Sequence, residues 1–201
     1  MKSIATRAGR GALGAVLIVA TVSGDTPPSR KDATLLRQKI DAIAAHAERP
    51  GGPARRTIVT EREVNAYFAF EAKDQLPVGV VDPSVTILGT GRLSGKAIVD
   101  LDAVRKAKGP TSLLDPMNYL WGRLPVSAVG VLKTSKGVGH FELESTHING
   151  VPIPKLLLQE IVSYYSRTPE KPAGISLDDP FALPAKIRQI EVQRGQAIIV
   201  Q

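Results

Sequence analysis

The stretch that decides the fold is residues 80–101, which read VVDPSVTILGTGRLSGKAIVDL. From Val80 onward the spacing of apolar residues changes from the period of a helix to a period of two. Apolar and polar residues alternate before Gly89 and again from Leu93 to Leu101. Gly89 and Gly91 supply the turn between the two runs, so the stretch predicts an antiparallel hairpin.

Two further pairs of alternating segments follow toward the C-terminal end. The first pair is 126–134 and 138–146, and the second is 187–192 and 196–201. Short turn sequences, Ser135-Lys136-Gly137 and Arg194-Gly195, separate the members of each pair. We expect the three hairpins to form one antiparallel sheet that twists and curls.

Three segments have helical spacing. Residues 32–48 carry an apolar stripe at spacings of four, three and four, and residues 155–167 carry an unusually wide apolar arc. A third helix is predicted to begin at Glu61, because Thr60 and Glu63 have the spacing of a capping box, and to end after Leu76.

Residues 102–118 are harder to interpret. They contain a helical fragment, DAVRKAK, and a turn of helix is expected at 117–121. Together these elements predict an α+β fold in which a curved antiparallel sheet surrounds one or two long helices.

The first 24 residues have the features of a secretory signal. A basic start precedes the apolar run 11–22, GALGAVLIVATV, which is short for a bilayer of about 30 Å, and small residues around Gly24 suit cleavage. An uncleaved N-terminal anchor is the alternative. We expect an exported, periplasmic protein with a signal at 1–24, a linker at 25–31 and a single domain over 32–201.

Composition excludes several kinds of chemistry and partner. The chain has no Cys, which removes thiolate metal sites, thiol nucleophiles and lipoprotein attachment. Loss of the three basic residues of the signal would lower the net charge from +7 to +4, a weak basic balance that does not favour nucleic acid. No phosphate-binding glycine loop or serine-nucleophile elbow occurs. We therefore expect no enzyme activity and no cofactor.

The ionisable residues give no clear catalytic or metal site. His140 and His147 lie seven residues apart, so they point to opposite faces of a regular strand and cannot share a metal unless a bulge intervenes. Asp100 and Asp102 could form a carboxylate pair or hold calcium, which leaves a hydrolase as one alternative. Solvation, with Asp102 as the cap of a helix, is the favoured interpretation.

The apolar surplus points instead to a ligand. A curled sheet over helices leaves an elongated groove, which suits an acyl chain, although each of the apolar residues could equally fill the core. We expect Arg92, Lys96 or Lys155 at the mouth. The predicted lining residues are aromatic or aliphatic, and they are Val64, Tyr67, Phe68, Trp121, Phe141, Leu143, Leu158, Ile161, Tyr164 and Tyr165.

Short motifs resemble those of a known family. The segments 60–67 (TEREVNAY), 91–101 (GRLSGKAIVDL) and 181–184 (FALP) are similar to segments of bacterial exported proteins with a tubular lipid-binding (TULIP-like) fold, the LmeA-like phospholipid-binding family. The resemblance implies a long helix wrapped by a curved antiparallel sheet that holds a phospholipid or similar amphiphile without a cofactor. The predicted helix at 32–48 has no counterpart there.

These observations lead to one hypothesis and one principal alternative. The hypothesis is non-catalytic, periplasmic binding or carriage of a lipid, with transient contact to a membrane or an envelope transport component. The alternative is a cell-envelope scaffold or interaction protein with a filled core and no ligand. Neither interpretation requires a metal or a nucleic acid.

Overall fold

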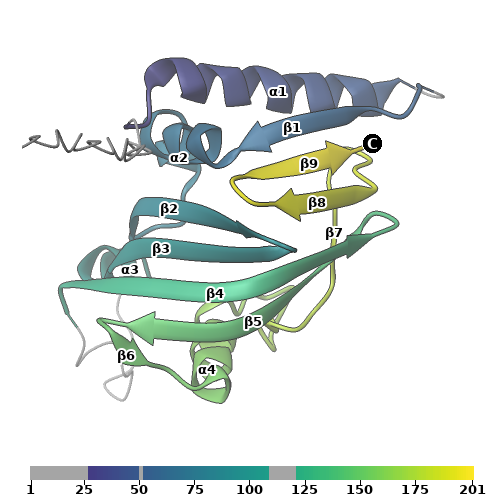
Figure 1. Ribbon diagram of the computed structural model, residues 1–201. Coiled ribbons are helices and arrows are strands. Elements are labelled where there is room, and N and C mark those ends of the chain that lie inside the picture. The colour runs from purple at the N-terminus through teal and green to yellow at the C-terminus, as the bar shows by residue number, and fades with distance from the viewer. Residues whose placement is uncertain (1–26, 50–51, 109–120) are drawn as a thin grey trace, which may run out of the picture.

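The computed structural model describes residues 27–49, 52–108 and 121–201. It shows an α+β fold in which all strand pairs are antiparallel (Figure 1). The predicted signal at 1–24 lies outside the described residues, as does all but the last residue of the helical turn predicted at 117–121.

The strands form two sheets. The larger has six strands, in which β2 to β6 lie in chain order and β7 pairs with β5. Its strands are β2 (Val80–Gly89), β3 (Arg92–Asp100), β4 (Arg123–Ser135), β5 (Val138–Ile148), β6 (Val151–Pro152) and β7 (Phe181–Ala182). The smaller sheet has the order β1-β9-β8, with β1 (Arg56–Thr60), β8 (Gln189–Gln193) and β9 (Gln196–Val200).

The prediction of three hairpins is confirmed, but the prediction that they form one sheet is wrong. The last hairpin, β8–β9, pairs with β1 instead. The reason is that side chains of the second helix occupy the outer edge of β2. Asn65 bonds both the N–H and the carbonyl of Val85, and Glu61 accepts from the N–H of Ile87. A strand therefore cannot pair with β2 at these residues.

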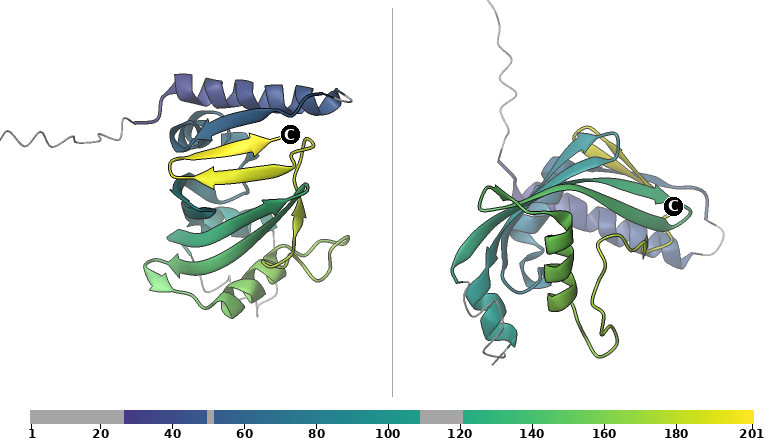
Figure 2. Two further views of the ribbon diagram at one scale, coloured as in Figure 1. Left: turned by 45° about the vertical axis from the view of Figure 1, so that its right-hand side comes forward. Right: turned by 90° about the horizontal axis from the view of Figure 1, so that it is seen from below.

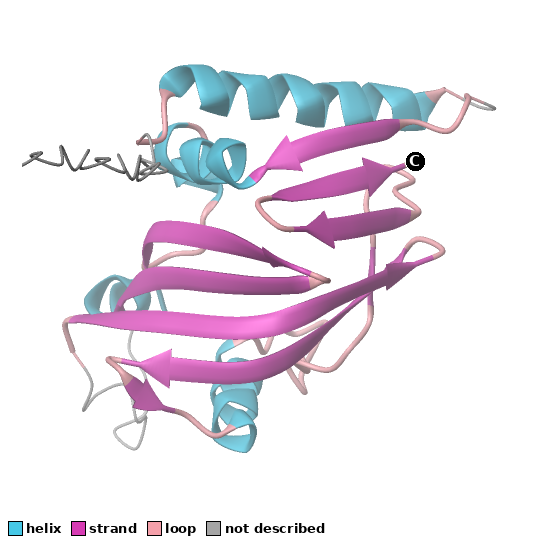
Figure 3. Cartoon of the chain, in the orientation of Figure 1, coloured by secondary structure: helices cyan, strands magenta, loops and turns pink. Residues whose placement is uncertain are grey.

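In the described residues, four α-helices and one 3-10 helix accompany the sheets (Figure 3). They are α1 (Arg30–Glu48), α2 (Glu61–Phe70), η1 (Lys73–Gln75), α3 (Leu101–Lys108) and α4 (Lys155–Tyr165). The predicted start of α2 is confirmed, but the helix ends at Phe70 and not after Leu76. The N–H groups of Glu71 and Ala72 both donate to the carbonyl of Tyr67, and the second of these bonds spans five residues and so closes the helix.

The helices lie in different places on the sheets. In Figures 1 and 2, α1 crosses above β1 and α2, whereas α4 lies at the far end of the larger sheet, beside β5 and β6. A small core of Ile43, Leu183 and Ile187 joins α1 to the smaller sheet. Within the described residues, no helix is long and apolar enough to cross a membrane.

The register of the larger sheet separates a mainly apolar face from a mixed one, because cross-strand partners share a face. The mixed face carries the polar residues Ser94, Lys96, Ser127, Lys133, His140 and His147 together with Ile98, Val129 and Val131. The other face is apolar, and it carries Val85, Ile87, Leu93, Ala97, Val99, Val126, Leu132, Phe141, Leu143 and Ile148.

Candidate apolar ligand cavity

The start of α2 is fixed by its own sequence. The hydroxyl of Thr60 accepts from the N–H of Glu63 at 3.2 Å, and the Glu63 carboxylate accepts from the N–H of Thr60 at 2.9 Å. This is the predicted capping box, and it is confirmed. Because Glu63 is itself buried, the cap also holds this end of α2 against its neighbours.

A lysine of α1 completes the contact. The Lys39 ammonium donates to both carboxylate oxygens of Glu63, at 2.6 and 2.8 Å, and to the carbonyl of Ile58 at 2.7 Å. Burial raises the pKa of Glu63, but the hydrogen bonds from Lys39 and from the backbone of Thr60 outweigh burial and hold that pKa below its ordinary value. Glu63 is therefore ionised at neutral pH and ties α1, β1 and α2 together.

The opposite side of α2 is tied to β2. The Asn65 amide donates to the carbonyl of Val85 and accepts from its N–H, both at 2.8 Å. Just before this point β2 is irregular, with a register shift between Val81 and Ser84. Asp82 has a φ of 47°, in the left-handed region that Asp tolerates better than most residues, and Pro83 follows it. The bulge moves this part of β2 out of line with the rest of the strand.

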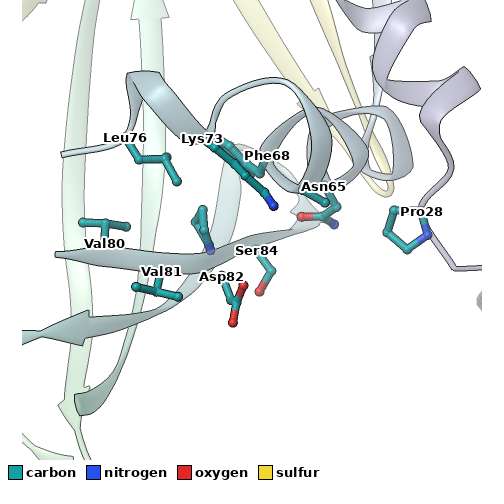
Figure 4. Close-up of a pocket in the computed structure, with 11 residues that line it drawn as sticks. Pro28, Asn65, Phe68, Lys73, Leu76, Val80, Val81, Asp82 and Ser84 are labelled. Carbon is teal, nitrogen blue, oxygen red and sulfur yellow. The ribbon is translucent and has the colours of Figure 1, made fainter. Parts of the chain in front are cut away.

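A cavity of about 500 Å³ lies between α2, η1 and the bulged part of β2 (Figure 4). Its volume is within the range of about 300–1,000 Å³ that is typical of small-molecule sites. Most lining residues are apolar, and they are Pro28, Phe68, Ala69, Leu76, Val80, Val81 and Pro83. The polar lining residues are Asn65, Lys73, Asp82 and Ser84.

The lining groups are not evenly distributed. In Figure 4, Leu76, Val80 and Val81 lie at one end, and the polar atoms of Asn65 and Ser84 lie toward the end near Pro28. The Asn65 amide is occupied by β2, so its role is structural. The cavity thus has one wholly apolar end, and one mixed end where Phe68 and Pro28 lie beside the polar side chains, which suits a molecule that is itself amphiphilic.

Two opposite charges line the cavity. Lys73 and Asp82 are both exposed, and neither makes an ion pair with another residue in the described parts of the chain. Among the described residues that line this cavity, they are also the only charged ones. A ligand that reaches them can therefore engage either charge without first breaking an ion pair.

Three of the predicted lining residues lie on α2, and one of them lines the cavity. Phe68 is half-buried in its wall. Val64 and Tyr67 are half-buried on the same helix but do not line it, and Tyr67 accepts a long hydrogen bond of 3.4 Å from Gln75.

The other predicted residues form a separate group around β5 and α4. Phe141 and Leu143 lie on the apolar face of β5, where the Phe141 ring covers Gly130 so closely that an added Cβ there would come within 2.5 Å of it. On α4, Leu158 is half-buried, whereas Ile161 and Tyr164 are 37% and 41% exposed. Tyr165 is the last residue of this helix. Trp121, just before β4, is 70% exposed. Because α2 packs on α1, β1 and β2 whereas α4 packs on β5, one groove lined by all ten residues is not formed.

The polar side of α4 is covered by the loop that follows it. Gln159 donates to the carbonyl of Ile175 and accepts from the N–H of Leu177, and Ser166 accepts from the N–H of Ile175. Gly174 lies so close to the backbone of Ser163 that no side chain fits there. Since the loop occupies this side, the exposed apolar side chains of α4 lie on another face of the helix.

The basic residues expected at the mouth lie elsewhere. Arg92 pairs with Glu144 at 2.7 Å, and Lys155 pairs with Asp178 at 2.5 Å. Lys96 lines a different hollow, on the other side of Asp82. The residues that do line the cavity include Leu76, Val80 and Val81, which were not predicted. The sequence did contain one signal for the bulge that shapes the cavity, because Pro83 interrupts a strand pattern.

The two aspartates bond to different partners. Asp100 accepts from the N–H of Ala103 at 3.0 Å and from Arg123, and these bonds lower the pKa of Asp100. Asp102 accepts from the N–H of Gly122 and pairs with Arg105. The helix cap is therefore supplied by Asp100, and the prediction that Asp102 supplies it is wrong, because α3 begins at Leu101, two residues before the start that a cap at Asp102 implies.

The histidines show how a bulge alters a strand. The extra residue in β5 opposite Val129 and Gly130 brings His140 and His147 to the same face, so the expectation for a regular strand does not apply. Their partners on β4 are Lys133 and Ser127, six residues apart, or about 20 Å along the strand. In the described parts of the chain, no three His, Asp or Glu side chains gather as a metal site requires.

Comparison with known proteins adds no assignment. No family model matches the chain, and no curated protein matches its sequence. The likeness to the LmeA-like family therefore rests on the short motifs alone. In the structure these form the start of α2, the β2–β3 turn with β3, and β7 with the two residues after it.

Proposed function

We propose that the protein binds one amphiphilic lipid in the cavity between α2 and β2, with its alkyl chain among the apolar residues. The observation that supports this most strongly is a cavity of about 500 Å³ whose lining is mostly apolar and is wholly apolar at one end. The resemblance of 60–67 to lipid-binding proteins adds support, because this segment builds the helix that forms one wall. The function is carriage or storage without chemical conversion, in the periplasm.

The driving force is the removal of the alkyl chain from water. Burial of each methylene is worth about 0.8 kcal/mol, so a short length of chain is enough for useful affinity. A methylene group needs about the room of a water molecule in the liquid, ~30 Å³, so the cavity has room for roughly 15 such groups. This size suits one alkyl chain and not the two chains of a complete phospholipid.

The alternative of a scaffold with a filled core is less well supported. The cavity is open to an amphiphile, and no fully buried large side chain occurs among the described residues. A filled core would place such side chains between the sheets and the helices. The many half-buried apolar residues of the larger sheet favour binding over pure scaffolding.

The proposal is tested by native mass spectrometry of gently purified protein, together with uptake of a fluorescent fatty acid. We expect co-purified lipid at one molecule per chain and saturable uptake. Phe68→Trp should obstruct the cavity and reduce uptake by about tenfold or more, since a larger ring takes the space of several methylene groups.

Phe70→Trp is the matched control. Phe70 lies on the same helix, but its ring lies under the Arg30 guanidinium at 5.0 Å and does not line the cavity. We expect Phe70→Trp to bind as the wild type does. Absence of lipid in the purified protein together with no uptake, or equal uptake by a folded Phe68→Trp variant, would contradict the proposal.

A further inference from the structure

We infer that the ligand of the α2–β2 cavity is a single-chain lipid with a zwitterionic head group, in which an ammonium faces Asp82 and a phosphate faces Lys73. The inference rests on the proposed function and specifies its ligand. It is carried by the two charges that line the cavity, which are of opposite sign and have no ion-pair partner in the described parts of the chain.

The two charges come from different elements. Lys73 belongs to η1, directly after α2, and Asp82 belongs to the bulge of β2. Both residues line one cavity, yet the Lys73 nitrogen and the Asp82 oxygens are farther apart than the 4.0 Å that defines an ion pair. A ligand with separated positive and negative groups can therefore lie between them, whereas a purely anionic head group would be attracted by Lys73 and repelled by Asp82.

The backbone supports a specific position for the carboxylate. Asp82 has a φ of 47° and precedes Pro83, which restricts the backbone at this point. The side chain is thus presented from a bulge of limited freedom. Lys96, across the strand pair from Ser84, lines the neighbouring hollow with Asp82 but makes no ion pair with it.

The size of the cavity sets the rest of the ligand. Room for roughly 15 methylene-sized groups accommodates a single chain, so lysophospholipids are the appropriate probes. The test measures binding of three probes with the same acyl chain, each below its micelle concentration. They are a lysophosphatidylethanolamine, which is zwitterionic, a lysophosphatidylglycerol, which is anionic, and a monoacylglycerol, which is neutral.

The wild type should bind the zwitterionic probe about three- to tenfold more tightly than either of the others, the size of effect expected for exposed charge contacts. Asp82→Asn removes the carboxylate and keeps a residue that tolerates the left-handed backbone, so it should abolish the preference for the zwitterionic over the anionic probe. Lys73→Gln should abolish the preference for the zwitterionic over the neutral probe.

Matched controls are available on the exposed surface. Asp179→Asn and Lys136→Gln change exposed charges that lie outside the cavity lining and make no ion pair with any described residue, and they should leave the ranking of the probes unchanged. Lys96→Gln should also preserve the ranking. If Lys96→Gln abolishes it, the lysine beside the neighbouring hollow, and not Lys73, selects the head group, and the inference is wrong.

The outcomes separate this inference from the proposed function. Equal binding of the three probes, or preference for the anionic one, would overturn the zwitterionic head group while leaving a lipid cavity that Phe68→Trp still obstructs. Unchanged ratios in Asp82→Asn and Lys73→Gln would overturn it as well. If no probe binds and the purified protein carries no lipid, both the proposed function and this inference fail.

Discussion

Apolar side chains are more deeply buried in the half of the molecule around α1, α2 and the smaller sheet than in the half around β3 to β6 and α4. Among the described residues, the buried apolar side chains lie in or next to the first half or on β2, with the exception of Leu101. None of them lies on β3 to β6 or on α4. Large apolar side chains that remain exposed, such as Trp121 and Leu157, are frequent in the second half.

The ion pairs show the same division. In the first half, Asp32, Arg37 and Lys39 of α1 pair with Arg62, Glu71 and Glu63 of α2 or its end. In the second half, the pair Lys133–Glu142 joins the neighbouring strands β4 and β5, and the pair Arg92–Glu144 joins β3 to β5 across β4, both at the exposed surface. The comparison indicates that stability resides in the first half, and the cavity lies where α2 meets the first strand of the larger sheet.

The largest loss of stability is therefore expected from a substitution in the core of the first half. Ile43→Ala removes a side chain that is 8% exposed and packs on Leu183 and Ile187, so it should lower the free energy of unfolding by about 2–5 kcal/mol. Urea denaturation measures the loss. Ile161→Ala is the control in the second half, and because Ile161 is more exposed it should cost about 1 kcal/mol or less. Equal losses would remove the distinction between the halves.

The next effect concerns the contact between α1 and α2. Glu63→Gln leaves the Lys39 ammonium with a weaker partner and should lower the free energy of unfolding by about 1–3 kcal/mol. Glu142→Gln breaks the exposed Lys133–Glu142 pair and should give no measurable change. A loss in Glu142→Gln as large as that in Glu63→Gln would contradict the assigned roles.

The Lys39–Glu63 pair also predicts that the stability of the protein depends on pH. The folded-state pKa of Glu63 is lowered, so its contribution to stability is fully present above its ordinary pKa of 4.5 and is lost as the pH falls through the lowered folded value. The difference in unfolding free energy between the wild type and Glu63→Gln should therefore shrink in acid. A difference that stays constant from neutral pH to about pH 3 would show that charge is not its origin.

The smallest effect is expected on α4. Leu157→Ser replaces a side chain that is 49% exposed, and it should change the free energy of unfolding by less than about 0.5 kcal/mol. Thermal unfolding is a sufficient measurement, with Leu183→Ser as the buried control. A destabilisation of Leu157→Ser comparable with that of Leu183→Ser would show that α4 is part of a packed core.

Local patterns in the sequence predicted much of the fold. The alternation in β2 and β3 and the capping box of Thr60 and Glu63 are local signals, and the structure has both features. The division into two sheets was not predictable, because it depends on Asn65 and Glu61 reaching β2 from another element. Hydrogen bonds between distant segments leave no periodic trace in a sequence.

The candidate site was predicted only in part for a similar reason. Phe68 was expected on the inner face of a helix and does line the cavity. Leu76 and Val81 were missed because they lie in a turn and a bulge, where apolar residues follow no helical or strand period. Tyr164 and Ile161 have helical spacing, but spacing does not reveal which face of α4 another element covers.

Methyl-resolved NMR during titration with a single-chain amphiphile tests the central claim most directly, because the cavity and α4 carry different methyl-bearing side chains. We predict saturable shifts and ligand contacts at Leu76, Val80 and Val81, with Leu157 and Ile161 unaffected. Shifts confined to Leu157 and Ile161, with Leu76, Val80 and Val81 unchanged, would contradict the account and place the lipid on α4.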